Sequence, residues 1–401
     1  MKNKTILNWL FFGLIVFSFS SCMKDEFLES RSEVTIEIDN SKLEGEYTLS
    51  NVKIQLQEIN SQTTTSATLA EGADAATANL TYGTYTATLE GDITMSVNGT
   101  EKAMKVKSHK SNIVVNSEAL TISLETFLSD PSANFVFKEI FFTGTLSEEG
   151  KQYNGDKYFI IHNNSSDTLY ADGLFIAQSD FLTITKRDYT PDVMKDAVSS
   201  DQIFRIPGNG TEYPVLPGED FIIANNAINH TTGNPNSIDL SNADFEIELI
   251  GSINVDNPAV PNTVNISGNL LMHNQGYTAY VMGRLPEGMD DDKFREENAY
   301  TYSYIAVNGR ELSFDSYKIP NSYIIDAVNL SVKTGFEWLV TAPTLDMGWS
   351  YAGLVTGDKE RYNKSVVRKQ LGTLDNGKAL LQDTNNSTVD FDPAVKATLL
   401  K

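Results

Sequence analysis

The segment Phe135-Val136-Phe137-Lys138-Glu139-Ile140-Phe141-Phe142-Thr143-Gly144 gives the strongest indication of the fold. It is short, almost entirely apolar, and ends in glycine. A run of this kind is typical of a strand that is buried on both faces. A second run rich in aromatic and β-branched residues follows at 157–161. We therefore expect residues 134–401 to form a mostly β domain around these strands.

The residues on the N-terminal side predict a second β structure. Apolar and polar residues alternate in two stretches, at Val34, Ile36 and Ile38 and again at Val52, Ile54 and Leu56. This period of two indicates strands with one buried face, and Asn98-Gly99 predicts a tight hairpin turn. Strands at this spacing favour a β-sandwich over residues 32–128. Residues 61–79, rich in Ser, Thr and Ala, predict a loop within it.

Two further segments concern the organisation of the chain. The stretch 129–132, Ser-Asp-Pro-Ser, predicts the boundary between the two β domains. Residues 191–197 begin with Pro and Asp, which suits a brief helix. Few other stretches have a helical pattern, so the fold class predicted for the whole chain is mainly β.

The N-terminal sequence has the features expected of an export signal. Lys2 and Lys4 precede an apolar run at 6–19. That run is shorter than the roughly 20 residues of a membrane span, and it fits a secretory signal. It ends in Phe-Ser-Ser-Cys22, which resembles the lipobox of bacterial lipoproteins, where the cysteine is diacylated and the chain is cut before it. We therefore predict a lipoprotein signal peptide at 1–21, with palmitate among the attached acyl chains, and a lipidated tether at 22–31.

The residues after Cys22 point to a destination. Lys24, Asp25 and Glu26 resemble the surface-export signal of Bacteroidota lipoproteins, which implies an outer-membrane protein that faces the extracellular side. The alternatives are a secreted protein with a stray cysteine and a lipoprotein that faces the periplasm. Cys22 is the sole cysteine, so the mature chain contains no disulfide and no cysteine ligand for zinc.

Charge excludes one class of partner. The chain has 53 acidic and 31 basic residues, a formal net charge of −22. A nucleic-acid-binding protein needs a basic face, so we expect no nucleic-acid partner. The negative charge also favours solubility.

Catalytic signatures are absent from the sequence. The histidines are few and scattered, at His109, His162, His230 and His273. There is no His-Glu-x-x-His helix, no nucleophile elbow and no phosphate-binding loop. We therefore expect a protein without enzymatic activity and without a cofactor. A hydrolase is kept as a less favoured hypothesis, and its structural mark would be a group of carboxylates, or His162 and His230, in one cleft.

Two acidic stretches are candidate cation sites. Near the C-terminus Asp383, Asn385, Asp390 and Asp392 bring oxygen ligands together, and calcium takes six to eight oxygens. Their spacing does not fit an EF-hand loop. The alternative is a set of turns whose side chains bond to their own backbone. The run 290–292, Asp-Asp-Asp, favours a solvated loop tip.

Aromatic residues are the candidate ligand-binding groups. Tyr302 lies in Tyr-Thr-Tyr-Ser-Tyr, which places three tyrosines on one face of a strand, and Trp338 and Trp349 follow. Exposed aromatic rings could stack on a sugar ring or another flat ligand, or anchor a protein interface. The alternative is that these rings pack within the sheets.

Several motifs resemble known folds. Residues 82–91, Gly-x-Tyr followed by alternation, are similar to a late strand of the small Ig-like sandwiches called prealbumin-like or carboxypeptidase-regulatory-like. Residues 157–174 and 217–224 resemble the aromatic second strand, the Asn-rich turn and the later Pro-Gly-Glu turn of the lamin-tail-like sandwich. This second resemblance covers about 135–230.

A wider resemblance covers most of the mature chain. It rests on segments at 229–230, 238–246, 319–328, 365–369 and 381–391, of which the last, with Asp-Thr-Asn-Asn-Ser, is the most distinctive. Together they resemble an uncharacterised family of Bacteroidota lipoproteins, domain of unknown function 4876. The resemblance implies a lipoprotein that is often encoded near TonB-dependent outer-membrane receptors, and it implies no activity.

These observations lead to one expectation and two alternatives. We expect a surface-exposed outer-membrane lipoprotein that acts as a non-catalytic binding or accessory subunit, with a TonB-dependent transporter as the candidate partner. The alternatives are a structural or adhesive surface module without a transport partner and, less favoured, a secreted hydrolase.

Overall fold

The computed structural model describes residues 30–41, 43, 46–70, 72–97, 100–129, 134–251 and 255–401. The predicted signal peptide and export signal, with Cys22, Lys24, Asp25 and Glu26, lie outside these residues. So do the predicted turn at 98–99 and most of the predicted boundary at 129–132. Almost all regular elements in the described residues are strands, which confirms the prediction of a mainly β chain.

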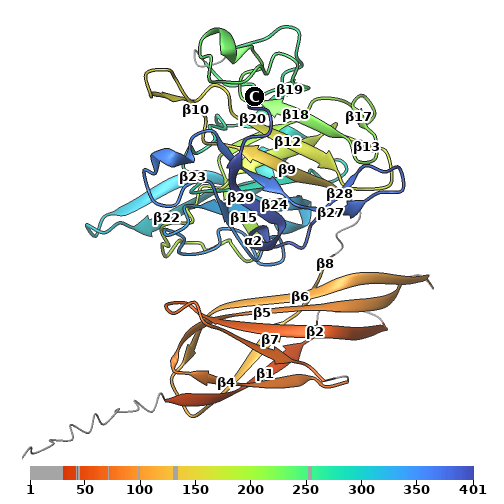
Figure 1. The fold of residues 1–401 in the computed structure, drawn as a ribbon, viewed down its shortest axis with the longest axis vertical. Helices are drawn as coiled ribbons and strands as arrows, with labels where there is room; N and C mark the ends of the chain where they lie inside the picture. The colour runs from red at the N-terminus through yellow and green to blue at the C-terminus, as the bar shows by residue number, and fades with distance from the viewer. Residues whose placement is uncertain are drawn as a thin grey trace, which may run out of the picture.

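The first unit is a β-sandwich that begins with strand β1 at Arg31 (Figure 1). Three strands form one sheet in the order β4-β1-β7, and five form the other in the order β3-β2-β5-β6-β8. Their bounds are β1 Arg31–Asp39, β2 Tyr47–Glu58, β3 Thr64–Thr68, β4 Ala75–Thr81, β5 Gly83–Val97, β6 Thr100–Val115, β7 Ala119–Glu125 and β8 Phe127–Ser129.

Alternation along these strands builds the first core. Strand β1 buries every second residue, and Ile36 and Ile54 are completely buried between the sheets. The predicted loop at 61–79 is wrong, because β3 and most of β4 lie within it. Alanines at 67, 76 and 78 alternate with polar residues and fill narrow positions in the core. Side chains this small give a weak hydrophobic pattern, although the period of two is present.

The second unit is built on two six-stranded sheets. Their strand orders are β19-β18-β12-β9-β26-β29 and β20-β16-β14-β21-β24-β25. The first sheet uses β9 Phe135–Phe141, β12 Tyr158–Asn163, β18 Asp220–Ala224, β19 Phe245–Glu246, β26 Lys364–Arg368 and β29 Phe391–Lys396. The second uses β14 Leu174–Gln178, β16 Gln202–Arg205, β20 Val264–Ser267, β21 Ala279–Arg284, β24 Ile324–Ser331 and β25 Ser350–Tyr351.

The apolar segment at 135–141 is the central strand of the first sheet. Strand β9 pairs with β12 on one side and with β26 on the other. Phe137 and Phe159 face the core between the sheets, whereas Phe141 and Tyr158 pack into a second cluster on the outer face. The sandwich is not complete within 135–230, because strands from the C-terminal half of the chain finish both sheets.

Smaller elements cover the outside of this unit. A three-stranded sheet, β15-β23-β22, packs beside the second large sheet, and its β22–β23 hairpin projects from the body (Figure 1). The helix α1, Asp291–Asn298, contacts both strands of that hairpin.

The bounds of the remaining strands and of the second helix are β10 Thr145–Leu146, β11 Gln152–Tyr153, β13 Leu169–Tyr170, β15 Ala197–Ser200, β17 Pro214–Val215, β22 Ala299–Ile305, β23 Glu311–Pro320, β27 Gln370–Thr373, β28 Ala379–Leu381 and α2 Ser387–Asp390. The 3-10 turns are η1 His230–Thr232, η2 Asn321–Tyr323 and η3 Lys359–Arg361.

The helix predicted at 191–197 is wrong. Residues 194–196 form only a turn, and the peptide bond between Thr190 and Pro191 is cis. Strand β15 starts at Ala197, so pairing with β23 replaces helix formation. None of the helices in the described part has the length and apolar character needed to cross a bilayer.

Candidate functional site

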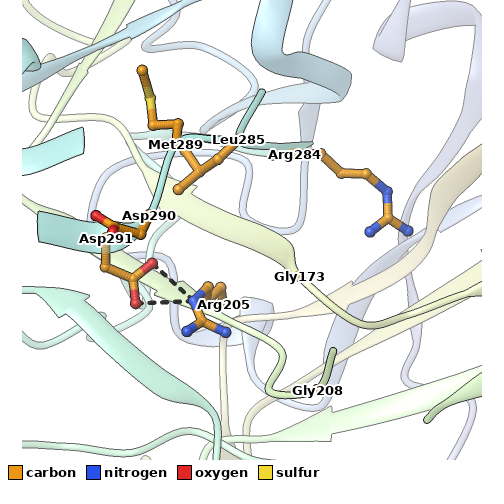
Figure 2. Close-up of a pocket in the computed structure, with 8 residues that line it drawn as sticks. All are labelled: Gly173, Arg205, Gly208, Arg284, Leu285, Met289, Asp290 and Asp291. Carbon is orange, nitrogen blue, oxygen red and sulfur yellow. Dashed lines mark hydrogen bonds and ion pairs between the residues drawn. The ribbon is translucent and has the colours of Figure 1, made fainter. Parts of the chain in front are cut away.

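A cavity of about 300 Å³ opens where the second large sheet meets helix α1. Figure 2 shows its lining, which combines two arginines, two acids, two apolar side chains and two glycines. The lining residues are Gly173, Arg205, Gly208, Arg284, Leu285, Met289, Asp290 and Asp291. A cavity of this size lies at the lower end of the range for small-molecule sites.

Pairing of three strands brings the arginines together. Strand β14 lies between β16 and β21, and all three are antiparallel neighbours. Arg205, the last residue of β16, is opposite Phe175, and Arg284, the last residue of β21, is opposite Leu174. The two guanidinium-bearing residues therefore flank the first two residues of β14, although they are far apart in sequence.

Arg205 is held by an ion pair with helix α1. Its Nε atom donates to both carboxylate oxygens of Asp291, at 2.8 and 3.0 Å (Figure 2). Both side chains are partly exposed. Asp291 therefore largely neutralises the positive charge of Arg205 within the cavity.

Arg284 has a different environment. Its two terminal nitrogens donate to the backbone carbonyls of Tyr170 and Asp172. Burial lowers the pKa of this guanidinium, and the nearby charge of Asp172 opposes that effect. An arginine remains protonated across the accessible pH range, so Arg284 keeps its positive charge in the cavity wall.

Asp172 fixes the loop beneath Arg284. Its carboxylate accepts from the backbone N–H groups of Gly210, Glu212 and Tyr213, at 3.0, 2.8 and 2.8 Å. Burial raises the pKa of Asp172, but these three hydrogen bonds outweigh it and hold the pKa below its ordinary value. Gly208 is required here, because it has φ of +110° and a Cβ would lie 2.2 Å from Asp172 Oδ1.

The acidic run at 290–292 has structural partners. Asp290 is the N-cap of α1 and accepts from the backbone N–H of Lys293 at 2.9 Å. Asp291 pairs with Arg205, and Asp292 pairs with Arg295 one turn later. Asp290 and Asp292 remain exposed, Asp291 is partly buried, and the run starts helix α1.

The lining of the cavity suits binding. Guanidinium groups donate hydrogen bonds, carboxylates accept them, and Leu285 and Met289 offer an apolar surface. The lining contains no serine, cysteine, lysine or histidine, so its carboxylates and guanidinium groups are the charged side chains that a bound molecule would meet.

The structure separates the two histidines that were the predicted mark of a hydrolase. His162 bonds through Nδ1 to Asp220 Oδ1 at 2.6 Å and through Nε2 to the Ala379 carbonyl at 3.0 Å. His230 lies beyond the opposite end of β12, where Nδ1 contacts the hydroxyl of Tyr153 at 2.8 Å. Its Nε2 lies 2.9 Å from the Asn226 carbonyl. Both nitrogens of each ring are therefore engaged by the framework.

Tyr302 and Trp338, two of the predicted platform residues, belong to one aromatic cluster. Tyr302 is only 8% exposed, and Phe181 and Phe314 pack against its ring. Tyr189 stacks near Trp338, with ring centroids 6.0 Å apart, and Lys186 lies over the indole ring. The indole Nε1 donates to the Leu182 carbonyl at 2.8 Å. These contacts give both residues a packing role, and their role in ligand binding stays a prediction.

Trp349 lies in a separate ladder. Its ring stacks on Phe336 at 4.8 Å and is tilted against Tyr351 at 5.8 Å. All three side chains are partly buried. The structure therefore does not join Trp349 to Tyr302 and Trp338 in one platform.

The predicted calcium residues are largely engaged by the protein itself. The carboxylate of Asp390 accepts from Thr384 and Asn386, and Asp383 contacts Arg368 at 3.1 Å. Asn385 has positive φ in a turn, and Asp392 is exposed. Within the described residues no group of three or more His, Cys, Asp or Glu side chains is arranged to hold a metal ion. Calcium binding stays a prediction.

Sequence reasoning missed Arg205 and Arg284. Each ends an ordinary strand pattern, and neither belongs to a recognised motif. Their proximity depends on β14 lying between β16 and β21. Two stretches singled out in the sequence do reach this cavity: the acidic run 290–292 supplies Asp290 and Asp291, and the lamin-tail-like stretch 157–174 supplies Gly173.

Comparison with solved structures supports the fold. A DUF4876 family protein from Bacteroides thetaiotaomicron is similar with a TM-score of 0.58 and 24% identity, over 92% of this chain and 96% of that chain. A candidate adhesin from Bacteroides ovatus has a TM-score of 0.18 and 9% identity, over 73% and 86% of the two chains. A similarity this low supports no conclusion. No curated protein matches the sequence significantly.

A family model gives the sequence relationship. Residues 216–398 match the family described as "protein of unknown function (DUF4876)". The match contains β18 and most of the strands that complete both large sheets, together with Arg284, Asp290 and Asp291 of the cavity. The resemblance found in the sequence is confirmed over residues 216–398, which match this family model.

Proposed function

We propose that this protein is a non-catalytic binding subunit that a lipid on Cys22 anchors at the outer face of the outer membrane. The observation that carries the proposal is the cavity between the second large sheet and α1. Its lining offers guanidinium, carboxylate and apolar groups that suit binding. The lipobox-like sequence, followed by Lys24, Asp25 and Glu26, supports the location. The candidate partner is a TonB-dependent transporter.

The anchoring part of the proposal has a direct test. Two acyl chains give a lasting membrane attachment, so the wild type should sediment with outer membranes and incorporate labelled palmitate. Cys22→Ala should lose both properties. Protease added to intact cells should degrade the wild type, whereas replacing Lys24, Asp25 and Glu26 with alanine should protect it. Membrane attachment of Cys22→Ala, or a wild type resistant to protease on intact cells, would contradict the proposal.

The transporter partner requires a separate experiment. A pull-down from detergent-solubilised outer membranes should recover a β-barrel receptor with the wild type. The matched control is the same pull-down with an unrelated surface lipoprotein from the same cells. Recovery of no barrel, or equal recovery with the control, would remove the accessory role and leave a binding protein that acts alone.

A second candidate function is supported by the projecting hairpin. Along β22, β23 and their turn, Ile305, Val307 and Phe314 are 61%, 95% and 43% exposed. Exposed apolar side chains on a projection favour contact with another macromolecule, as a structural or adhesive module would make. Whole cells that display Ile305→Ser/Val307→Ser should then bind host glycoprotein less than wild-type cells. Equal binding by the two would argue against this alternative.

A further inference from the structure

The charges around the cavity are unevenly matched. Arg205 and Asp291 form an ion pair at 2.8 Å and largely cancel one another. Arg284 donates to two backbone carbonyls, which are neutral acceptors. The nearby Asp172 directs its carboxylate to three backbone N–H groups of the 210–213 loop. One wall of the cavity therefore presents a guanidinium that has no carboxylate bonded to it within the described residues.

The facing wall has the opposite character. Figure 2 shows Asp290 and Asp291 on the side away from the guanidinium of Arg284. Asp290 uses Oδ1 to cap α1, and its side chain is exposed. Leu285 and Met289 form an apolar surface beside the acids. A ligand that fits both walls therefore carries an anionic group at one end and hydrogen-bond donors at the other.

Size limits the ligand further. The volume of about 300 Å³ equals that of roughly ten water molecules, at about 30 Å³ each. Such a space accommodates one sugar residue or a molecule of similar size. Gly173 and Gly208 leave the backbone accessible at the floor, since neither has a side chain.

We propose that this cavity binds a single sugar acid, with the carboxylate on Arg284 and the hydroxyl groups toward Asp290. The inference rests on the proposed binding function and specifies its ligand class. A planar guanidinium matches a carboxylate through paired N–H groups. Hydroxyls donate to the carboxylate of Asp290, while the apolar face of the sugar ring lies on Met289. A doubly charged phosphate fits less well, because Asp290 and Asp291 repel the additional negative charge.

The test is isothermal titration of the full mature chain in detergent, with glucuronate as the probe. We expect saturable binding that weakens as ionic strength rises. Glucose, acetate and inorganic phosphate should each bind at least tenfold more weakly. Arg284→Gln should reduce glucuronate affinity at least tenfold. The matched control is Arg310→Gln in the exposed turn of the β22–β23 hairpin, which should bind glucuronate like the wild type.

A second variant keeps the proposal testable if Arg284→Gln fails to fold. Asp290→Asn retains the helix cap, because asparagine caps as well as aspartate. This variant should weaken the affinity for glucuronate at least fivefold and leave the affinity for acetate unchanged. Folded wild type that does not bind glucuronate, equal affinity in folded Arg284→Gln, or phosphate binding as tight as glucuronate would each overturn the sugar-acid proposal. Glucose binding as tight as glucuronate binding would overturn it as well, while the broader binding function would survive.

Discussion

At the scale of single residues, Arg368 connects distant parts of the second unit. This buried side chain donates from Nε to the Phe137 carbonyl at 2.8 Å and from Nη2 to Asp326 at 2.6 Å. A third contact joins Nη1 to Asp383 at 3.1 Å. Burial lowers the pKa of Arg368, but Asp326, Asp383 and Asp390 outweigh it and raise the pKa above its ordinary value. The charge is therefore permanent, and it links β9 and β24 to the segment before α2.

Replacing Arg368 should destabilise the protein strongly. Arg368→Met leaves the buried carboxylate of Asp326 without a cation, and breaking a buried pair in this way costs about 3–5 kcal/mol. Arg368→Lys should lie between the wild type and Arg368→Met, because an ammonium cannot contact three separated acceptors. Urea denaturation followed by tryptophan fluorescence measures both.

Arg310→Met provides the control for these variants. Arg310 lies in the exposed hairpin turn, so its loss should change stability by no more than about 0.5 kcal/mol. If Arg368→Met were as stable as Arg310→Met, the buried network would have no stabilising role.

At the scale of elements, the junction of β21 and β24 depends on one glycine. The register between the two strands shifts between Met282 and Gly283. A Cβ on Gly283 would lie 2.1 Å from the Tyr323 carbonyl oxygen and 2.6 Å from the Phe175 ring. The close approach of backbone and ring, rather than an unusual φ, excludes a side chain here. Arg284 follows directly, so this junction also positions the cavity.

Gly283→Ala should therefore destabilise the second unit by roughly 1–3 kcal/mol, as overpacking usually does. Thermal unfolding gives the measurement. Gly372→Ala is the control, because a Cβ there meets no atom within 4 Å. That control should be neutral or slightly more stable, since alanine reduces the freedom of the unfolded chain. Equal melting temperatures for the two variants would contradict the conclusion that close packing at Gly283 excludes a side chain.

The local hydrophobic pattern of the sequence predicts where strands form better than it predicts which strands pair with one another. The apolar run of β9 and the alternation in β1 were readable in the sequence, because burial on one or two faces determines them. The pairing of β9 with β26 was not, because it joins residues more than 220 positions apart and depends on the packing of the whole unit. The cavity was hidden for the same reason. Arg205 and Arg284 become neighbours only across β14, and no spacing along the chain records that.

At the scale of the whole molecule, the two units differ in their buried titrating groups. Burial lowers the pKa of His109 in the first unit to about 4, and its Nδ1 has no hydrogen-bond partner among the described residues. In the second unit burial, with Lys157 and Arg361, lowers the pKa of His273 to about 4. Burial also raises the pKa of Asp180 there to about 6.

These shifts have opposite consequences for stability. A histidine whose folded pKa lies below 6.5 contributes stability that is complete above pH 6.5 and is lost as the pH falls toward 4. An aspartate whose folded pKa is raised contributes stability that is complete below pH 3.8 and is lost as the pH rises through 6. On acidification Asp180 therefore compensates for His273 in the second unit. His109 has no counterpart of this kind among the shifted groups of the first unit.

The first unit should consequently unfold before the second as the pH falls from 7 to 4.5. The lowered pKa of His109 reduces the free energy of unfolding by about 3 kcal/mol once the pH has fallen to that pKa. Trp9 lies in the predicted signal peptide, and Trp338 and Trp349 lie in the second unit. In a chain that begins at residue 22, fluorescence therefore reports the second unit alone while far-UV circular dichroism reports both. The dichroism transition should begin at higher pH than the fluorescence transition. His109→Gln should bring the two together, and His273→Gln should leave the first transition in place. Coincident transitions in the wild type, or an unchanged gap in His109→Gln, would show that His109 does not control the acid sensitivity of the first unit.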